Sequence, residues 1–350
     1  MPEPTPSLGS FIHHLPKVEL HLHLEGSVRP ETLRELARAK RRLEKQTEDW
    51  IRKRQRQSYR YGTFQEFLNA FKHVTLLLET AADYALVTRR LVEWLATQNV
   101  KYAEITLAAG VVLWKKQSLE GVFNAVSAAA LEAQSRLGVR VNWIFDAIRH
   151  FGTEHTREVL AWAARFRERG VVALGIGGDE ERGPAELFPE IYREARDLGL
   201  HGVAHAGETV GPQSIRKAVE LLGAERIGHG LAAARDPQVL ALLRDRVIPL
   251  EVCPTSNVCT GLIPRFQDHP LPRLLEAGVV VTLNSDDPAM FGTSLEQEFQ
   301  QVARCFEFSA AEITNLCTNA VNASFLPSEE KQRLLQEIFE AGGISQGSSA

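Results

Sequence analysis

The chain has 350 residues, of which 44% are hydrophobic and 24% are charged, and its 40 basic side chains stand against 44 acidic ones. This composition is typical of a globular protein with a sizeable core. A formal net charge of -4 argues against a surface that binds nucleic acid or a membrane, so we expect a small-molecule partner.

The cysteines and the N-terminus indicate the compartment. The spacing of the four cysteines is typical neither of a disulfide framework nor of a Cys-x-x-Cys metal site, so we expect reduced, mostly buried thiols. The first residues lack a basic segment followed by an apolar run, and no stretch reaches the roughly 18 apolar residues of a membrane span. The sequence therefore predicts a cytoplasmic protein.

The first predicted strand, residues 18–24, places two histidines on one face. Side chains alternate along a strand, so His21 and His23 point the same way and the leucines around them point the other way. Taken alone, the pair is also compatible with polar residues on a solvated strand. Gly26 and Pro30 end the strand directly after the histidines, however, and parallel α/β sheets and barrels place their chemistry at such carboxyl ends.

A basic stretch from Arg38 to Arg60 follows the helix that Pro30 opens. It is compatible with a nucleic-acid patch, but the preferred interpretation is a solvated helical excursion that covers a pocket mouth. Two amphipathic helices are predicted next, over residues 63–78 and 80–99.

From residue 100 onward, apolar runs typical of buried strands alternate with helix-length segments. Together with the first strand the runs number eight, and the other seven begin at Val100, Val139, Val171, Gly202, Arg226, Val247 and Val279. This pattern predicts an α/β fold, a (β/α)8 TIM-type barrel with extra helices after strand one and at the C-terminus. We expect three C-terminal helices between Ser294 and Ala341, and a single domain over residues 1–350 with its core at about 12–341.

A barrel of this type carries its catalytic groups at the carboxyl ends of its strands. Histidines and acids gather at these ends: His21, His23, the GGDE segment 177–180, His205, Glu208, His229, Asp286 and Asp287. Three imidazoles and one carboxylate suit zinc with an open position for water, so we predict one Zn2+ per chain. The predicted ligands are His21, His23, His205 and Asp286.

Zinc can lower the pKa of bound water to about 7 and so supply hydroxide as a nucleophile at neutral pH. His229 lies on the strand beside that of His205, where we expect it to hold or deprotonate the water, while Glu208 exchanges a proton with the substrate. We assign no metal or catalytic role to the other seven histidines, which are His13, His14, His73, His150, His155, His201 and His269.

Six motifs appear in an order known from one enzyme family: KVELHLHLEGS, GGDE, HAGE, IGHG, CPTSN and NSDDP. From about Lys17 to Ala323 the chain resembles the adenosine deaminase family of metal-dependent amidohydrolases. The resemblance implies the same four zinc ligands, Glu208 as the group that protonates purine N1, and His229 as the group that orients the attacking water. It further implies that Asp287 bonds N7 and that the Gly178 backbone amide bonds N3. Hydroxide addition to C6 would then expel ammonia and leave a 6-oxopurine.

One position departs from the family pattern. The family carries an aspartate two residues after the second histidine, where it contacts the ribose 5′-hydroxyl, and this chain has Glu25 there. We predict that His23 and Glu25 contact the substrate, a purine nucleoside that reacts with water. Adenosine is the first expectation. The alternative is a 5′-modified adenosine such as aminodeoxyfutalosine from menaquinone synthesis, and adenine is less favoured.

Other interpretations stay open. The arginines of the basic stretch 38–60, or Arg149 just past strand three, are hypothetical receptors for an anionic 5′ group. A metal-dependent esterase or lactam hydrolase would use the same barrel and ligands. A nucleic-acid-binding protein would use the basic stretch instead. The sequence predicts no particular oligomeric state.

Overall fold

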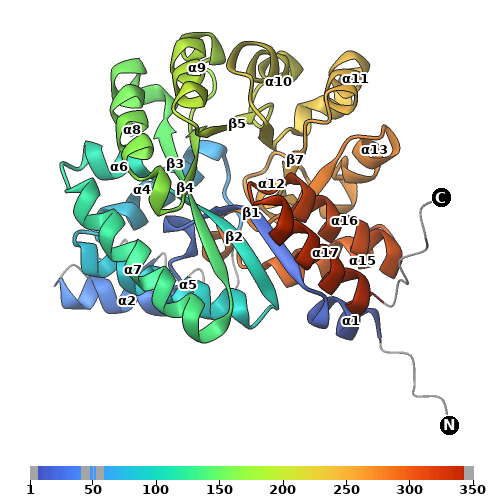
Figure 1. Ribbon diagram of the computed structural model, residues 1–350, viewed down its shortest axis with the longest axis horizontal. Coiled ribbons are helices and arrows are strands. Elements are labelled where there is room, and N and C mark those ends of the chain that lie inside the picture. The colour runs from blue at the N-terminus through green and yellow to red at the C-terminus, as the bar shows by residue number, and fades with distance from the viewer. Residues whose placement is uncertain (1–6, 41–47, 50, 53–58, 343–350) are drawn as a thin grey trace.

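Eight parallel strands form the centre of the computed structural model, which describes residues 7–40, 48–49, 51–52 and 59–342 (Figure 1). Each strand pairs with the next one along the chain. The strands are β1 (Lys17–His23), β2 (Val100–Leu107), β3 (Arg140–Ile148), β4 (Val171–Gly177), β5 (His201–Ala206), β6 (Arg226–His229), β7 (Leu250–Val252) and β8 (Val281–Leu283). The predicted (β/α)8 barrel is confirmed.

Helices surround the strands and connect them. Between β1 and β2 lie α2 (Pro30–Ala39), α4 (Phe64–Leu77) and α5 (Ala81–Ala96), and between β2 and β3 lie α6 (Ala109–Trp114) and α7 (Leu119–Leu137). The later connections carry α8 (Thr153–Arg165), α9 (Pro189–Asp197), α10 (Pro212–Lys217), α11 (Pro237–Asp245), α12 (Pro254–Cys259) and α13 (Leu271–Glu276). The two amphipathic helices predicted after strand one are confirmed as α4 and α5. Much of the basic stretch 38–60 lies outside the described residues.

Further helices precede and follow the barrel strands. Helix α1 (Leu8–His14) precedes the barrel, and α14 (Pro288–Phe291), α15 (Leu295–Cys305), α16 (Ala310–Ala323) and α17 (Ser328–Ala341) follow it. Helix α1 packs beside α15 and α16, and α16 in turn lies against β1 and β8 (Figure 1). The three predicted C-terminal helices are confirmed as α15, α16 and α17, and α16 covers the place where the barrel closes.

Local sequence sets the helix ends. Thr80 and Asp83 form a capping box at the start of α5, in which each side chain accepts a hydrogen bond from the backbone N–H of the other. Gly138 ends α7 in the left-handed conformation, with φ of 72°, which a residue without a Cβ adopts at little cost. These local signals set where α5 begins and where α7 ends.

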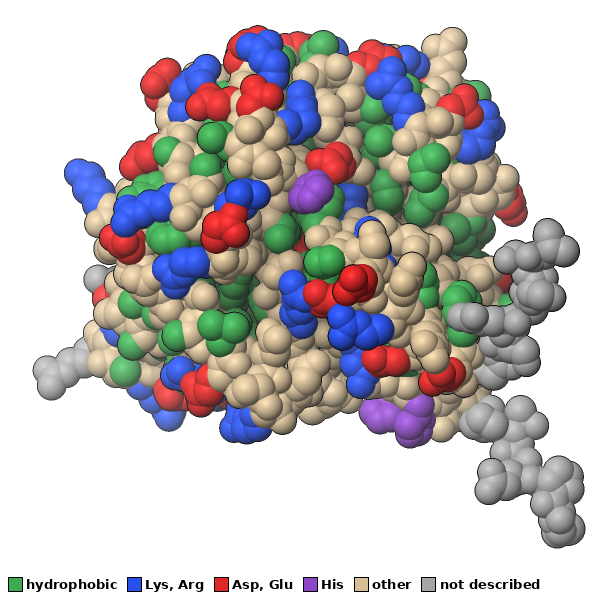
Figure 2. Space-filling model, in the orientation of Figure 1, with side chains coloured by type: hydrophobic (Ala, Val, Ile, Leu, Met, Phe, Trp, Pro, Cys, Tyr) green, Lys and Arg blue, Asp and Glu red, His purple; other side chains and the backbone are tan. Residues whose placement is uncertain are grey.

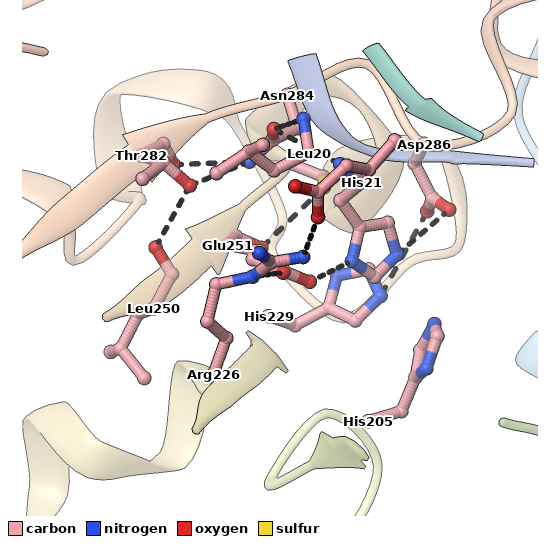
Figure 3. Close-up of polar contacts among 12 residues, drawn as sticks. Leu20, His21, His205, Arg226, His229, Leu250, Glu251, Thr282, Asn284 and Asp286 are labelled. Carbon is pink, nitrogen blue, oxygen red and sulfur yellow. Dashed lines mark hydrogen bonds and ion pairs between the residues drawn. The ribbon is translucent and has the colours of Figure 1, made fainter. Parts of the chain in front are cut away.

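The closure between β8 and β1 differs from a regular ladder. The His23 N–H donates to the Asp286 carbonyl oxygen at 2.9 Å, and the Asp286 N–H donates to the His21 carbonyl oxygen at 3.0 Å. Earlier along β1 at the same closure, Asn284 Oδ1 accepts hydrogen bonds from the backbone N–H groups of Leu20 at 2.9 Å and His21 at 3.2 Å (Figure 3). A side chain thus takes the place of a strand at this closure, where regular β8 has already ended at Leu283.

Surface charge is mixed on the face drawn in Figure 2, where basic and acidic side chains are interspersed. Many charged side chains of the described residues form ion pairs, such as Arg157 with Glu194 at 3.0 Å and Arg265 with Asp268 at 2.7 Å. Within the described part of the chain, no helix is both long enough and apolar enough to cross a membrane.

Candidate active site

A pocket of about 310 Å³ opens at the carboxyl ends of the strands, where the sequence predicts the chemistry. Its volume is at the lower end of the range for small-molecule sites. The predicted site residues His23, Gly178, His205, Glu208, His229, Asp286 and Asp287 line it. Helix α4 contributes Phe64, Phe67 and Phe71 to the wall, so the extra helices after strand one help to enclose the pocket.

The four predicted zinc ligands lie together. Asp286 Oδ1 is 3.4 Å from Nε2 of both His21 and His23. The His205 ring centroid is 4.6 Å from that of His21 and 5.4 Å from that of His23. Zinc bonds of about 2.0 to 2.1 Å in tetrahedral geometry place ligand atoms roughly 3.4 Å apart. The spacing of Asp286 to the first two imidazoles therefore fits a zinc ion.

The surroundings of His21 favour a positive charge (Figure 3). Its Nδ1 hydrogen-bonds to Glu251 Oε2 at 2.8 Å, and its buried Nε2 faces Asp286 with no hydrogen-bond partner among the described residues. Burial lowers the pKa of His21, but the two carboxylates outweigh burial and raise that pKa well above its usual range. Because one ring nitrogen is held by Glu251, the other is directed at the predicted metal position.

Glu251 is itself held by a buried arginine. Arg226 Nε donates to Glu251 Oε1 at 2.6 Å, and Arg226 Nη2 donates to Glu104 Oε2 at 2.6 Å. Burial raises the pKa of Glu251, yet the Arg226 charge and the His21 hydrogen bond bring it down to about 2. The carboxylate that orients His21 therefore stays charged although it lies inside the barrel.

Glu208 and His229 face each other across the pocket floor, with Glu208 Oε1 3.5 Å from His229 Nε2. Burial, together with the nearby charges of Asp286 and Glu180, raises the pKa of Glu208 well above its usual range. Burial lowers the pKa of His229 to about 3. The raised pKa favours the protonated acid at Glu208 and the lowered pKa favours the neutral imidazole at His229, which suits Glu208 as a proton donor.

The loop that carries Glu208 is organised by Glu180, the last residue of the GGDE motif. Glu180 is 3% exposed and accepts the backbone N–H groups of Gly207 at 2.9 Å, Glu208 at 3.0 Å and Thr209 at 2.9 Å. It also accepts the Ser214 hydroxyl at 2.6 Å. One buried carboxylate thus fixes the backbone of Glu208, the predicted proton donor, to the loop after β4.

Gly178 and Asp287 border the pocket as predicted. Gly178 has φ of 93°, a conformation that favours glycine, and a Cβ there would lie 3.0 Å from His150 Nδ1. Asp287 Oδ1 is buried without a hydrogen-bond partner among the described residues. A Cβ on Gly26 would overlap that oxygen at 1.6 Å, so glycine at position 26 leaves the room that Asp287 occupies.

Glu25 is not among the residues that line the pocket. Its carboxylate is fully buried, and it accepts the Ala108 N–H at 3.2 Å. Ala108 does line the pocket, so Glu25 supports the pocket wall through that backbone N–H and does not itself reach the pocket, contrary to the prediction that it contacts the substrate. Arg149 is also buried, and its Nη2 donates to the His205 carbonyl oxygen at 2.6 Å. The hypothesis that Arg149 receives an anionic 5′ group is therefore wrong.

Sequence reasoning missed several contributors. Glu251 and Arg226 act through contacts between distant segments, which no local pattern reveals. Glu180 belongs to the predicted GGDE segment, but its support of the Glu208 loop was not predicted. His150 was given no role, yet it lines the pocket beside Gly178. The backbone conformation also marks two of the site residues in the structure, because His229 and Asp286 have φ of 60° and 61°. Such left-handed conformations are costly for residues other than glycine and gather at functional sites.

A family model described as adenosine deaminase matches residues 16–341. The chain belongs to the adenosine deaminase family. It is thus a hydrolytic aminohydrolase of adenine-related small molecules, built on the metal-dependent amidohydrolase barrel. The predicted reaction class is confirmed.

Relatives within the adenosine deaminase family differ in substrate. An aminodeoxyfutalosine deaminase of Streptomyces coelicolor is 38% identical over 342 residues, covering 96% of this chain and 87% of the relative. An adenosine deaminase of Clostridium kluyveri is 32% identical and covers 96% and 97% of the two chains. The crystal structure of an adenine deaminase from Arthrobacter aurescens aligns with a TM-score of 0.87 at 32% identity, over 93% of this chain and 98% of that one.

The Glu251→Gln variant is expected to bind zinc about 10- to 100-fold more weakly, because the uncharged amide holds the His21 ring less firmly. Competition with a chromophoric chelator measures the affinity. Glu104→Gln is the matched control, since it also removes a charge next to Arg226 but does not contact His21. Equal zinc affinity in the Glu251 variant and the wild type would contradict the role of Glu251.

The Glu180→Ala variant is expected to lower kcat/KM by about 100-fold with zinc retained, because a loop displaced by about 1 Å moves the proton donor off its target. Steady-state kinetics and zinc content are the measurements. The exposed neighbour Glu181, changed to Ala, is the control. Unaltered kinetics after loss of Glu180 would show that the loop holds Glu208 without it.

Proposed function

We propose that this protein is a zinc-dependent deaminase that removes the 6-amino group of an adenosine modified at its 5′ position, with aminodeoxyfutalosine as the first candidate. Water is the second substrate, and ammonia and the 6-oxopurine are the products. The observation that best supports this reaction is the environment of Glu208. This buried carboxyl group has a raised pKa, and its Oε1 lies 3.5 Å from His229 Nε2 beside the imidazole cluster.

One zinc ion would be held by His21, His23, His205 and Asp286, and when bound it would lower the pKa of a water molecule toward about 7. Glu208 gives its proton to purine N1, which makes C6 electrophilic. The water oxygen then adds to C6. The C6–N bond breaks with its electron pair on the amino nitrogen, which takes the proton of the added hydroxyl and leaves as ammonia. The remaining water proton restores Glu208.

Two groups orient the purine ring in this proposal. Burial and the adjacent Asp286 charge raise the pKa of Asp287 well above its usual range, so its carboxyl group is protonated and donates to N7. The Gly178 backbone amide bonds N3, as the resemblance of the GGDE motif implies. Both residues line the same pocket as Glu208, which supports a ring placed with N1 toward the acid.

The pocket rim supports a 5′ substituent larger than hydroxyl. Trp114 lines it while 46% exposed and stacks on Phe151 with centroids 6.0 Å apart, and Lys72 Nζ lies 5.6 Å from the Trp114 ring. Arg182 also lines the rim, and its charge helps burial to lower the pKa of His150. Neither Lys72 nor Arg182 forms an ion pair with another described residue. Apolar rings next to these two cations suit an apolar 5′ group that ends in an anion.

Adenosine, the first expectation from the sequence, remains the alternative substrate. The identity of 38% to an aminodeoxyfutalosine deaminase, against 32% to an adenosine deaminase, favours the 5′-modified compound. The burial of Glu25 points the same way, because this carboxylate does not reach the pocket where a 5′-hydroxyl would meet it.

The Glu208→Gln variant is expected to keep its zinc and lose about 100- to 10,000-fold in kcat, because the amide cannot protonate N1. Since only the protonated acid donates, wild-type kcat/KM should be level at low pH and fall as the pH rises through the raised pKa of Glu208. Metal analysis and a pH profile of absorbance-monitored turnover check both. Glu181→Gln is the control, and turnover near the wild-type level in Glu208→Gln would overturn the mechanism.

Substrate choice is tested by following the ultraviolet change from 6-aminopurine to 6-oxopurine with aminodeoxyfutalosine, adenosine, AMP and adenine in parallel. We expect the highest kcat/KM with aminodeoxyfutalosine. Lys72→Met and Arg182→Met should each lower its preference over adenosine about tenfold, by removing a charged hydrogen bond. Lys116→Met, an exposed lysine outside the pocket lining, is the control. If the wild type prefers adenosine, the protein is an adenosine deaminase and the proposal of a 5′-modified substrate is wrong. If it prefers AMP, Lys72 and Arg182 bind a 5′ phosphate.

A further inference from the structure

Three buried hydrogen bonds connect His229 to the backbone at the start of α13. Asn257 Nδ2, on α12, lies 3.3 Å from His229 Nδ1. Asn257 Oδ1 lies 3.2 Å from His269 Nε2. The Leu271 backbone N–H points at His269 Nδ1 at 3.1 Å. Because Asn257 is fully buried and His269 is only 3% exposed, this chain of contacts is shielded from water.

The direction of every hydrogen bond follows from the last one. A backbone N–H can only donate, so His269 Nδ1 accepts, and the neutral ring must carry its hydrogen on Nε2. That N–H needs an acceptor, which identifies the Asn257 atom facing it as the carbonyl oxygen. The Asn257 amide nitrogen therefore faces His229 and donates to Nδ1. With Nδ1 accepting, neutral His229 carries its hydrogen on Nε2.

We propose that Asn257 and His269 are positioning residues that hold His229 in the tautomer with hydrogen on Nε2, so that His229 serves deamination as a hydrogen-bond donor and not as a base. The kinetic part rests on the proposed function, whereas the tautomer does not. The ring is 1% exposed, and its Nε2 faces Glu208 Oε1 at 3.5 Å and Asp286 Oδ2 at 3.9 Å.

The chemical consequence concerns the proton of the attacking water. His229 can accept a proton only on Nδ1, and the Asn257 amide occupies that atom. The water proton therefore goes to the Glu208 carboxylate, which has just given its own proton to N1. His229 instead donates from Nε2 to the incoming oxygen and stabilises the negative charge that develops on it at C6. The sequence left open whether His229 holds or deprotonates the water, and the relay selects the first role.

The tautomer is measured directly by long-range 1H–15N correlation on the zinc-loaded, full-length protein with 15N-labelled histidine. The His229 signals are identified by their loss in His229→Gln. We expect the hydrogen on Nε2. A hydrogen on Nδ1 overturns the proposal even if the protein deaminates every substrate offered, and the spectrum reports equally well if it deaminates none. Failure of the relay and failure of the proposed function are thus distinguishable.

Variants test the consequence for catalysis. Asn257→Asp has the same shape but can only accept, so it should move the His229 hydrogen to Nδ1 and lower kcat by up to about 10,000-fold, with KM and zinc content little changed. His269→Leu should lower kcat as well, and His269→Gln should recover most of that loss, because its amide can donate to Asn257. The proposal fails if Asn257→Asp keeps the Nε2 tautomer or keeps its kcat, or if Gln and Leu at position 269 behave alike.

Discussion

The closure of the barrel between its last and first strands is the contact on which the site depends. The backbone of Asp286 pairs on both sides with the strand that carries His21 and His23, and this pairing sets the carboxylate 3.4 Å from both imidazoles. Asn284 fills the adjoining part of the closure with a side-chain oxygen in place of a regular ladder. The hydrogen bonds that close the barrel therefore also set the spacing between Asp286 and the two histidines that suits a metal ion.

Each reactive group is fixed by a second buried polar group. Glu251 holds His21, Glu180 holds the loop of Glu208, and Asn257 holds His229. In a low-dielectric interior such contacts are strong, and a partner left unsatisfied is costly, so each side chain has few alternative positions. The same burial drives the pKa values of the acid and the imidazole in opposite directions. Positioning and proton chemistry thus have a common physical origin.

The sequence predicted the barrel because eight apolar strands alternate with helices. It predicted that histidines and acids gather in one place because barrel strands end on one face. It could not predict the supporting contacts. Glu251 meets His21 across 230 residues of chain, and no local periodicity encodes that pairing. Glu25 shows a related limit, since a position two residues past His23 was expected at the substrate, but the chain turns there into a 3-10 helix and buries the carboxylate. The alternation of side chains along the strands thus predicts at which end of the barrel the site lies. Which side chains reach the pocket depends on three-dimensional packing.

The position of the closure also bears on how the protein is made. His21 and His23 lie on the first strand of the barrel and Asp286 follows the last one, so the two imidazoles are synthesised well before the carboxylate. A nascent chain on the ribosome can display the paired imidazoles long before the carboxylate that completes the set has emerged. A chain truncated before β8 would keep two or three of the ligands and lack the geometry that unites them. Tight binding of the proposed zinc ion would then depend on completion of the barrel up to Asp286.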